Sequence, residues 1–393
     1  MNRDLRWAAL ALFLWGLGEG LFYHFQPLYM ERLGASPESM GRILGFAGLL
    51  MTVSHLPIGW LVDRWDPRPL MWAGWAVGTL GGWVMALANQ LSWFVLGLWL
   101  YATSMFVMVP MNTYLTAARG RWTVARVLTT LSALFNLGMI FGPWLGARLA
   151  ARWGLPMVYR GAAGLFTLST LAILQVRAHV REETRPRAQT APRPRTLPKG
   201  LLAFAAFVAL ALFLVDLPHP LLPKFLKDYR GLDVQQIGEL GSAYALGSTL
   251  IGLTIGRWPA GLGLGLTLLA QALASATILF LTTPSLYLAA YFLFGALRPA
   301  RSLVIAQTRA FVPPQSQGLA YGLLETTMGL STALAAALAG WMYPRWPTGV
   351  FWLAIVGGVG SASVWWAWWL RHRNRPSPIA DPPPQTPSAP ENT

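Results

Sequence analysis

Apolar runs of helical length recur along the whole chain and are separated by short polar breaks. The first six runs cover roughly residues 7–29, 39–62, 69–88, 91–116, 124–151 and 156–176. A second set covers roughly residues 200–226, 234–256, 259–281, 284–308, 317–343 and 348–370. A helix needs about 20 apolar residues to cross a bilayer, and membrane strands would alternate instead of running continuously. The pattern predicts an all-α membrane protein with twelve transmembrane helices.

Two polar segments divide the chain. Residues 177–199 alternate Pro and Arg with almost nothing apolar to bury, so they are predicted to form a basic, flexible linker. Residues 372–393 are rich in Pro and polar residues and are predicted to form a disordered tail. Two six-helix bundles are therefore expected, at residues 1–176 and 200–371.

Composition and charge agree with a membrane protein and predict its orientation. The chain is 54% hydrophobic and 11% charged, whereas soluble domains carry about 25% charged residues. Lys and Arg concentrate on the side of the N-terminus, so both termini, the linker and the tail are predicted to be cytoplasmic. Anionic lipid headgroups and topology then explain the net charge of +15, and no nucleic-acid partner is expected.

The residues that several kinds of chemistry require are missing. The chain has no Cys, which excludes a disulfide framework, a thiolate metal site and a Cys nucleophile. None of its Lys residues follows the Gly-rich phosphate-binding pattern that direct ATP drive would need. No cluster of His, Asp and Glu has metal-ligand spacing. The sequence thus predicts no cofactor, no metal site and no enzyme.

The two halves of the chain resemble each other. PLYMERLGASPESMGRILG from Pro27 matches PKFLKDYRGLDVQQIGELG from Pro223. Gly59 and the residues at 63–65 have counterparts 193 positions later, beginning at Gly252. Parallel repeats of this kind place a substrate site between the halves near the bilayer midplane.

The segment GWLVDRWDPR between the second and third runs carries Gly59, Asp63, Arg64 and Arg68. These residues resemble the loop signature of the major facilitator superfamily of secondary transporters, although Asp66 and Pro67 depart from it. The resemblance covers residues 5–371. It implies two six-helix bundles, a small-molecule substrate, alternating access, and a cytoplasmic gating motif at these four residues. A charged turn that merely obeys the positive-inside rule is the alternative.

The fifth run contains NLGMIFGPWLGA, with Gly138, Gly142, Pro143 and Gly146. This segment is similar to a motif of antiporters in the same superfamily, especially drug exporters, which favours efflux over uptake. Close helix packing by small residues explains it equally without antiport. Drug exporters of the superfamily often carry an Arg in the fourth run. This chain has none between Tyr101 and Arg119, which weakens that comparison or moves the proton chemistry to Glu19.

Ionisable residues inside apolar runs are expensive and usually functional. Glu19 is predicted near the midplane, with Tyr23 and Gln26 on the same helical face at i+4 and i+7. Glu19 could exchange a coupling proton or cation, contact substrate, or make a structural hydrogen bond. Asp216 holds a related place in the seventh run, beside prolines that must interrupt the helix. His219 could share a proton with Asp216, or the prolines could form a bent gate without chemistry.

Arg298 and Arg301 lie within the tenth run and Glu325 lies at similar depth in the eleventh. A pair between Glu325 and one of these Arg residues would leave the other for an anionic substrate or a switching partner. Alternatively, Arg301 extends to the inner interface. By position, four residues are candidate cavity walls: Phe22, Asn112, Asn136 and Tyr244.

These observations predict a secondary active transporter of a small solute that works by alternating access. Proton coupling is expected, and efflux is favoured over uptake of sugars or organic anions. A membrane-embedded sensor or assembly factor built on a transporter fold is the alternative. The protein is expected to be a monomer that spans a bacterial inner or plasma membrane several times.

Overall fold

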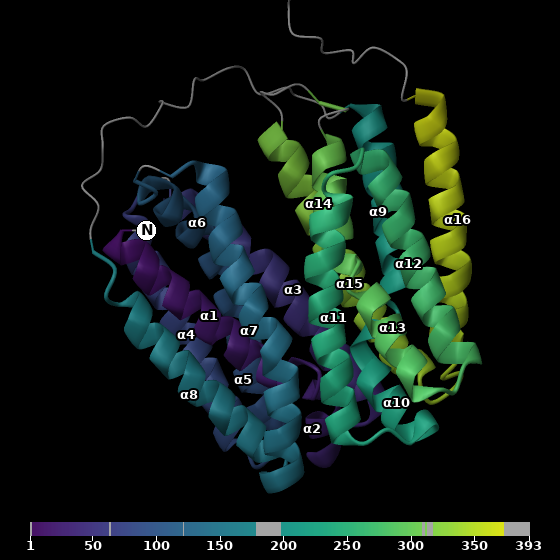
Figure 1. The fold of residues 1–393 in the computed structure, drawn as a ribbon, viewed down its shortest axis with the longest axis horizontal. Helices are drawn as coiled ribbons and strands as arrows, with labels where there is room; N and C mark the ends of the chain where they lie inside the picture. The colour runs from purple at the N-terminus through teal and green to yellow at the C-terminus, as the bar shows by residue number, and fades with distance from the viewer. Residues whose placement is uncertain are drawn as a thin grey trace, which may run out of the picture.

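The computed structural model describes residues 2–62, 64–120, 122–177, 198–308, 311–312 and 317–372, which form helices and no strand (Figure 1). The N-terminal half contains α1 (Arg3–Tyr23), α2 (Gln26–Arg32), α3 (Pro37–Val62), α4 (Pro67–Leu87), α5 (Leu91–Thr103), η1 (Ser104–Val107), α6 (Met108–Ala117), α7 (Val124–Trp153) and α8 (Leu155–Ile173). The C-terminal half contains α9 (Lys199–Asp216), η2 (His219–Leu221), α10 (Leu222–Arg230), α11 (Val234–Ile255), α12 (Ala260–Phe280), α13 (Pro284–Phe294), α14 (Leu297–Gln307), α15 (Gln317–Met342) and α16 (Gly349–His372).

The helices account for a protein that crosses the membrane many times. Within the described ranges, nine helical segments are long and apolar enough to span a bilayer. Helices α3, α8 and α11 occupy three further predicted runs but are not among those nine. The number of twelve crossings and the side of the termini therefore stay predictions. The predicted linker and tail lie almost wholly at residues 178–197 and 373–393, outside the described residues.

Prolines decide where several helical segments break. A proline cannot donate a hydrogen bond to the carbonyl four residues earlier. Pro27 removes this partner from Tyr23, the last residue of α1, and Pro220 removes it from Asp216, the last residue of α9. The break between α13 and α14 lies four residues before Pro299. Two broken segments thus place their ionisable residues next to irregular backbone.

The bounds of the helices repeat between the halves. Helices α4 and α12 have equal lengths, and both of their ends lie 193 residues apart. Helices α5 and α13, and helices α7 and α15, begin at the same separation. This is the offset that relates Gly59 to Gly252 in the sequence. The internal similarity therefore extends from residue types to the placement of helices.

The two halves lie side by side and meet toward one end (Figure 1). We name this the closed end; it carries α2, α10 and the connections at residues 33–36 and 231–233. The opposite end, which carries Asn2, Arg177, Pro198 and His372, is named the linker end. Helix α3 packs on α15, α7 on α11 and α2 on α10. Toward the linker end the ribbons of the two halves diverge.

Small residues bring the halves into close contact. A Cβ atom on Gly41 would lie 2.5 Å from the carbonyl oxygen of Ala336, and one on Gly340 would lie 2.6 Å from the Cα atom of Gly41. A Cβ atom on Gly238 of α11 would lie 2.6 Å from the carbonyl oxygen of Pro143 in α7. Helix backbones approach this closely only where side chains are absent or small.

Candidate functional site

Residues from both halves meet at a group of polar side chains near the helix breaks. Arg298 of α14 interacts electrostatically with Glu19 and Tyr23 of α1 and with Tyr244 of α11. Asp216, at the end of α9, interacts electrostatically with Tyr23 and Tyr244. We name the following set the central cluster: Glu19, Tyr23, His24, Asp216, Tyr244 and Arg298.

Glu19 is held by the aromatic interior of the N-terminal half. The Tyr101 hydroxyl donates a hydrogen bond of 2.9 Å to the Glu19 carboxylate. The Tyr101 ring in turn stacks on Trp15 and Phe166, with centroids 6.0 and 5.5 Å apart. In the described part of the chain, Glu19 forms no direct ion pair with Arg298. The two side chains therefore interact across the halves without a direct contact.

His24 joins this cluster because α1 ends one residue before it. Its ring centroid lies 5.2 Å from that of Tyr23, 5.6 Å from that of Tyr244 and 6.2 Å from that of Tyr291. The His24 Nε2 atom and the Tyr291 hydroxyl are buried and lack a hydrogen-bond partner among the described residues. Buried polar groups are usually paired, so these two atoms distinguish this part of the cluster from the rest of the interior.

Among the described residues, no hydrogen bond joins Asp216 and His219, so the sharing of a proton between them stays a prediction. The His219 Nε2 atom instead lies 2.9 Å from the Gln271 side-chain oxygen on α12. The helix ends at Asp216, so the two residues no longer share one helical face. Asp216 is 4% exposed, and none of the described residues donates a hydrogen bond to its carboxylate.

The predicted pair between Glu325 and Arg298 or Arg301 is also absent from the described residues. Arg301 donates hydrogen bonds to the Met328 carbonyl, at 3.1 Å, and to the Thr332 hydroxyl, at 3.0 Å. These acceptors lie on α15 one and two turns beyond Glu325, which is exposed. Arg301 therefore ties α14 to α15, whereas Arg298 faces the N-terminal half.

Two further predictions, for residues near the end of α1, need correction. Gln26 begins α2, so it does not continue the helical face of Glu19 and Tyr23, and it is buried. Phe22 was expected to line a cavity, but it is 0% exposed and packs edge-on against Tyr101, with ring centroids 5.4 Å apart.

The other expected cavity walls differ in exposure. Tyr23 is 42% exposed, and Tyr244 is 8% exposed. Asn112 of α6 is exposed and Asn136 of α7 is half-buried. The contacts of the described residues bring Tyr23 and Tyr244 into the central cluster.

The predicted cytoplasmic gating motif is described only in part. Asp63 lies outside the described residues, and Gly59 lies in α3, which ends at Val62. The Arg68 guanidinium forms an ion pair of 3.0 Å with Asp66, whose side chain also caps the first turn of α4. Arg64 follows in the connection between α3 and α4. Asp66, which departs from the superfamily signature, thus stabilises the start of α4.

The predicted packing motif of the fifth run lies against α1. A Cβ atom on Gly138 would lie 2.5 Å from the Leu17 nitrogen, and one on Gly142 would lie 2.5 Å from the Gly20 Cα atom. Gly146 approaches the Leu21 carbonyl in the same way. The neighbouring Pro143 instead faces α11 of the other half. This stretch of α7 therefore contacts both α1 and the C-terminal half.

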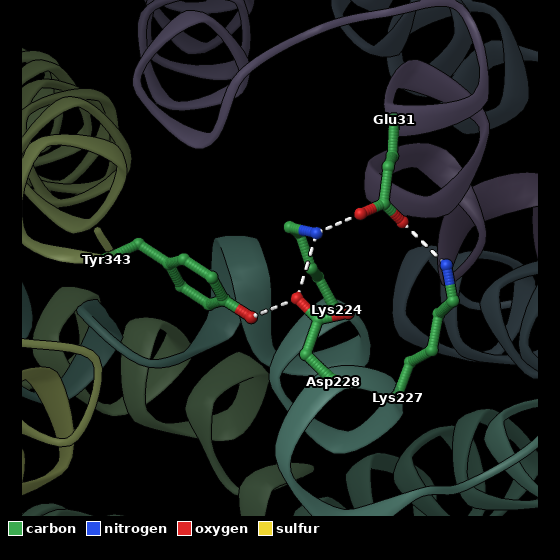
Figure 2. Close-up of polar contacts among 5 residues, drawn as sticks. All are labelled: Glu31, Lys224, Lys227, Asp228 and Tyr343. Atoms are coloured by element: carbon green, nitrogen blue, oxygen red, sulfur yellow. Dashed lines mark hydrogen bonds and ion pairs between the residues drawn. The ribbon is translucent and has the colours of Figure 1, made fainter.

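A second polar site joins the halves at the closed end (Figure 2). Lys224 and Lys227 of α10 both bind the Glu31 carboxylate of α2, and the Lys227 Nζ atom lies 2.7 Å from the Glu31 Oε2 atom. Lys224 also pairs with Asp228 at 2.9 Å, and the Tyr343 hydroxyl donates to Asp228 at 2.8 Å. We name these five residues the end network.

The charge balance of the end network stabilises ionised Glu31. Burial alone would raise the pKa of the Glu31 carboxyl, but the hydrogen bonds from Lys224 and Lys227 lower that pKa below its usual value. Nearby, Arg345 forms a second ion pair across the halves, with its Nη1 atom 2.5 Å from the Glu38 Oε1 atom. The sequence analysis missed the end network. One feature of the sequence could have revealed this network: Glu31 and Lys227 hold equivalent places in the repeat, four residues after Pro27 and Pro223.

Comparison with known proteins gives one family. The model of the Major Facilitator Superfamily matches residues 8–219 and 200–391. A Deinococcus radiodurans protein named as a candidate sugar efflux transporter is 28% identical over 188 residues, which are 45% of this chain and 47% of that protein. The Streptococcus pneumoniae multi-drug resistance efflux pump PmrA is 29% identical over 193 residues, 47% of this chain and 46% of its own. The chain thus spans under half the length of these relatives.

Solved structures share the architecture over nearly the whole chain. A mutant of the nucleoside transporter NupG superposes with a TM-score of 0.79 at 16% identity, covering 93% of this chain and 99% of its own. The D-xylose-proton symporter superposes with a TM-score of 0.68 at 13% identity, covering 92% and 96%. At such low identity the likeness shows the fold alone.

Proposed function

Because the chain belongs to the Major Facilitator Superfamily, a family of membrane transporters and not of enzymes, we propose that it moves a small polar solute by alternating access, with the central cluster as the substrate site. One observation carries this proposal: Arg298 of one half faces Glu19 and Tyr23 of the other. A solute bound there would touch both halves, so its binding would depend on their relative position.

The arrangement of the halves supports one stage of such a cycle. The ion pairs across the halves, Glu31 with Lys224 and Lys227 and Glu38 with Arg345, gather at the closed end. The ribbons diverge at the linker end (Figure 1). If the positive-inside orientation holds, the structure is an inward-facing state. The end network must then break when the protein opens to the outside.

The charges of the central cluster favour a solute without a large net charge. Glu19 and Asp216 supply two carboxylates, and Arg298 supplies one guanidinium beside the rings of Tyr23 and Tyr244. Hydroxyl, imidazole and guanidinium groups donate hydrogen bonds, and aromatic faces pack on apolar surface. We therefore favour a neutral or cationic organic solute with hydrogen-bonding groups over an organic anion.

Glu19 is our candidate for the coupling proton, because it lies in a membrane-spanning helix and faces a cation from the other half. Protonation of Glu19 would remove its attraction to Arg298 and so bias the position of the halves. Efflux is favoured by the names of the two relatives and by the antiporter-like segment of α7. We expect a monomer in a bacterial plasma membrane.

A ligand screen followed by transport tests this function. Purified full-length protein is heated with sugars, nucleosides, lipophilic cations and organic anions, since a bound ligand raises the apparent melting temperature with its concentration. The best ligand is then assayed in proteoliposomes with and without an imposed pH gradient. Accumulation that follows the gradient supports coupled transport, and its direction distinguishes efflux from uptake. A ligand that binds tightly but never crosses the membrane would favour the sensor alternative.

A further inference from the structure

A groove between α9 and α16 lies apart from the central cluster. It has a volume of about 220 Å³ and is lined by Gly200, Ala203, Phe204, Phe207, Phe311, Val364, Trp365 and Trp368. These residues come from the start of α9, the end of α16 and the short described segment at residues 311–312. The groove is therefore at the linker end of the C-terminal half.

Stacked aromatic rings form the floor of this groove. The Phe204 and Phe311 rings stack with centroids 4.8 Å apart, and the Trp365 and Trp368 rings stack at 5.2 Å. Phe311 also stacks on Trp368 at 5.5 Å. Rings that hold one another in this way make a preformed apolar surface. The hollow itself exists because Gly200 and Ala203 present almost no side chain above that floor.

The groove opens toward lipid. Helices α9 and α16 belong to membrane-spanning segments, and two apolar residues that line the groove, Ala203 and Val364, are exposed, with Val364 at 62%. Apolar side chains this exposed on a spanning helix face hydrocarbon, because the bilayer offers no water there. In a bilayer, lipid acyl chains are thus the molecules that would meet this groove.

Basic residues stand at the rim of the groove. Lys199 precedes Gly200 and is exposed at the first turn of α9, where unpaired backbone N–H groups also favour an anion. Arg371 and His372 lie in the last turn of α16, about one turn beyond Trp368. The His372 ring stacks on Trp368 at 4.6 Å. The described residues of this rim include no carboxylate.

We propose that the groove binds an anionic phospholipid, with an acyl chain on the aromatic floor and the phosphate between Lys199 and Arg371. The charge complementarity selects this occupant, since a neutral lipid would gain only the apolar contact. The predicted orientation places this end at the cytoplasmic leaflet, which attracts juxtamembrane basic residues. Because α9 carries Asp216 at its other end, the lipid would also brace a helix of the central cluster.

Native mass spectrometry of the full-length protein with phosphatidylglycerol or phosphatidylcholine tests this proposal. We expect preferential retention of phosphatidylglycerol. Replacing both rim cations, Lys199→Gln with Arg371→Gln, should weaken its apparent affinity by about tenfold or more, since each basic residue near a membrane surface contributes on the order of a few-fold. Equal retention of the two lipids, or unchanged affinity in the double variant, would overturn the proposal.

A groove-filling variant separates this site from general lipid contact. Ala203→Phe fills the groove, whereas Ala206→Phe adds the same ring to an exposed position of α9 that does not line it. Binding should fall in Ala203→Phe and persist in Ala206→Phe. Equal behaviour of the two variants would show that the lipid lies elsewhere. Soluble glycerol phosphate should not compete, and full competition would assign the rim to a free phosphate and overturn the lipid assignment.

Discussion

Glu31 and Lys227 hold equivalent places in the two repeats and touch each other across the halves, with the Lys227 Nζ atom 2.7 Å from the Glu31 Oε2 atom. Two similar halves facing each other bring equivalent positions together. Identical residues there would repel each other if charged, whereas opposite charges attract. The divergence of the repeats at this position thus provides an ion pair that holds the closed end together.

Glu31→Gln should loosen the closed end, because it leaves Lys224 and Lys227 without their partner from the other half. We expect a population shift toward opening on the order of 1 kcal/mol, or roughly fivefold. The chain has no Cys, so spin labels at Ser36→Cys and Gln235→Cys report the separation directly by pulsed electron resonance. Arg257→Gln is the matched control, because Arg257 is exposed in the connection between α11 and α12, away from the closed end. Identical distance distributions in all three proteins would contradict the role of the end network.

The contribution of Glu31 should depend on pH in one direction. The pKa of Glu31 is lower in the folded protein than its usual 4.5. A carboxyl with a lowered pKa stabilises the folded state fully above its usual pKa, and that contribution is lost as the pH falls through the lowered value. The difference in melting temperature between wild type and Glu31→Gln should be constant from pH 8 to about 6 and shrink below about pH 4.5. A difference that grows on acidification would refute this assignment.

Arg298→Gln should weaken substrate binding with little loss of stability, since Arg298 interacts with Glu19 and Tyr23 of the other half and, among the described residues, forms no hydrogen bond that ties its own helices together. Removing a charged hydrogen-bond donor costs about 2 kcal/mol, or roughly 30-fold in Kd. Arg301→Gln is the contrasting variant. It removes the bonds to Met328 and Thr332, so it should lower the melting temperature more than it lowers affinity. Isothermal titration measures the affinity of both variants, and thermal melts measure their stability. Equal effects of the two variants on affinity and on melting temperature would contradict the separate roles of Arg298 and Arg301.

Glu19→Gln should abolish the pH dependence of transport. The amide oxygen of Gln can still accept the Tyr101 hydroxyl hydrogen bond, so the fold should persist while the titratable group is lost. The measurement is the initial rate in proteoliposomes between pH 5.5 and 8.5. Tyr101→Phe is the control, because it removes the hydrogen bond and keeps the carboxyl group. An unchanged pH profile in Glu19→Gln would exclude Glu19 as the coupling residue.

Gly142→Ala should destabilise the protein by about 1 to 3 kcal/mol, the usual cost of overpacking. The new methyl group would lie 2.5 Å from the Gly20 Cα atom and would push α7 away from α1. Gly164→Ala is the matched control, because a Cβ atom at Gly164 of α8 meets nothing within 4 Å. Thermal melts in detergent should show a lower melting temperature for Gly142→Ala alone. Equal melting temperatures would mean that α1 and α7 can separate at no cost.

Local rules read from the sequence placed most helices and their breaks. Periods of apolar residues predicted the spans, and prolines predicted the break after α9, because a missing N–H group acts on its own segment. The repeat offset of 193 residues also reappears in the bounds of α4 and α12. The early end of α1 at Tyr23 was not predicted, so Gln26 was placed by continuing the helix past its break, whereas Phe22 was placed by position alone.

The partners of charged residues were decided only by the tertiary structure. Equal depth suggested Glu325 for Arg301, but depth leaves the rotation of a helix about its axis undetermined, and packing turned Arg301 toward Thr332. The end network likewise joins Glu31 to lysines 193 and 196 residues away. By itself the sequence determined the membrane-spanning helices, the duplication and the candidate ionisable residues, since these depend on near neighbours. Which of those residues meet across the halves depends on how two separate bundles pack, and that is a property of the folded chain.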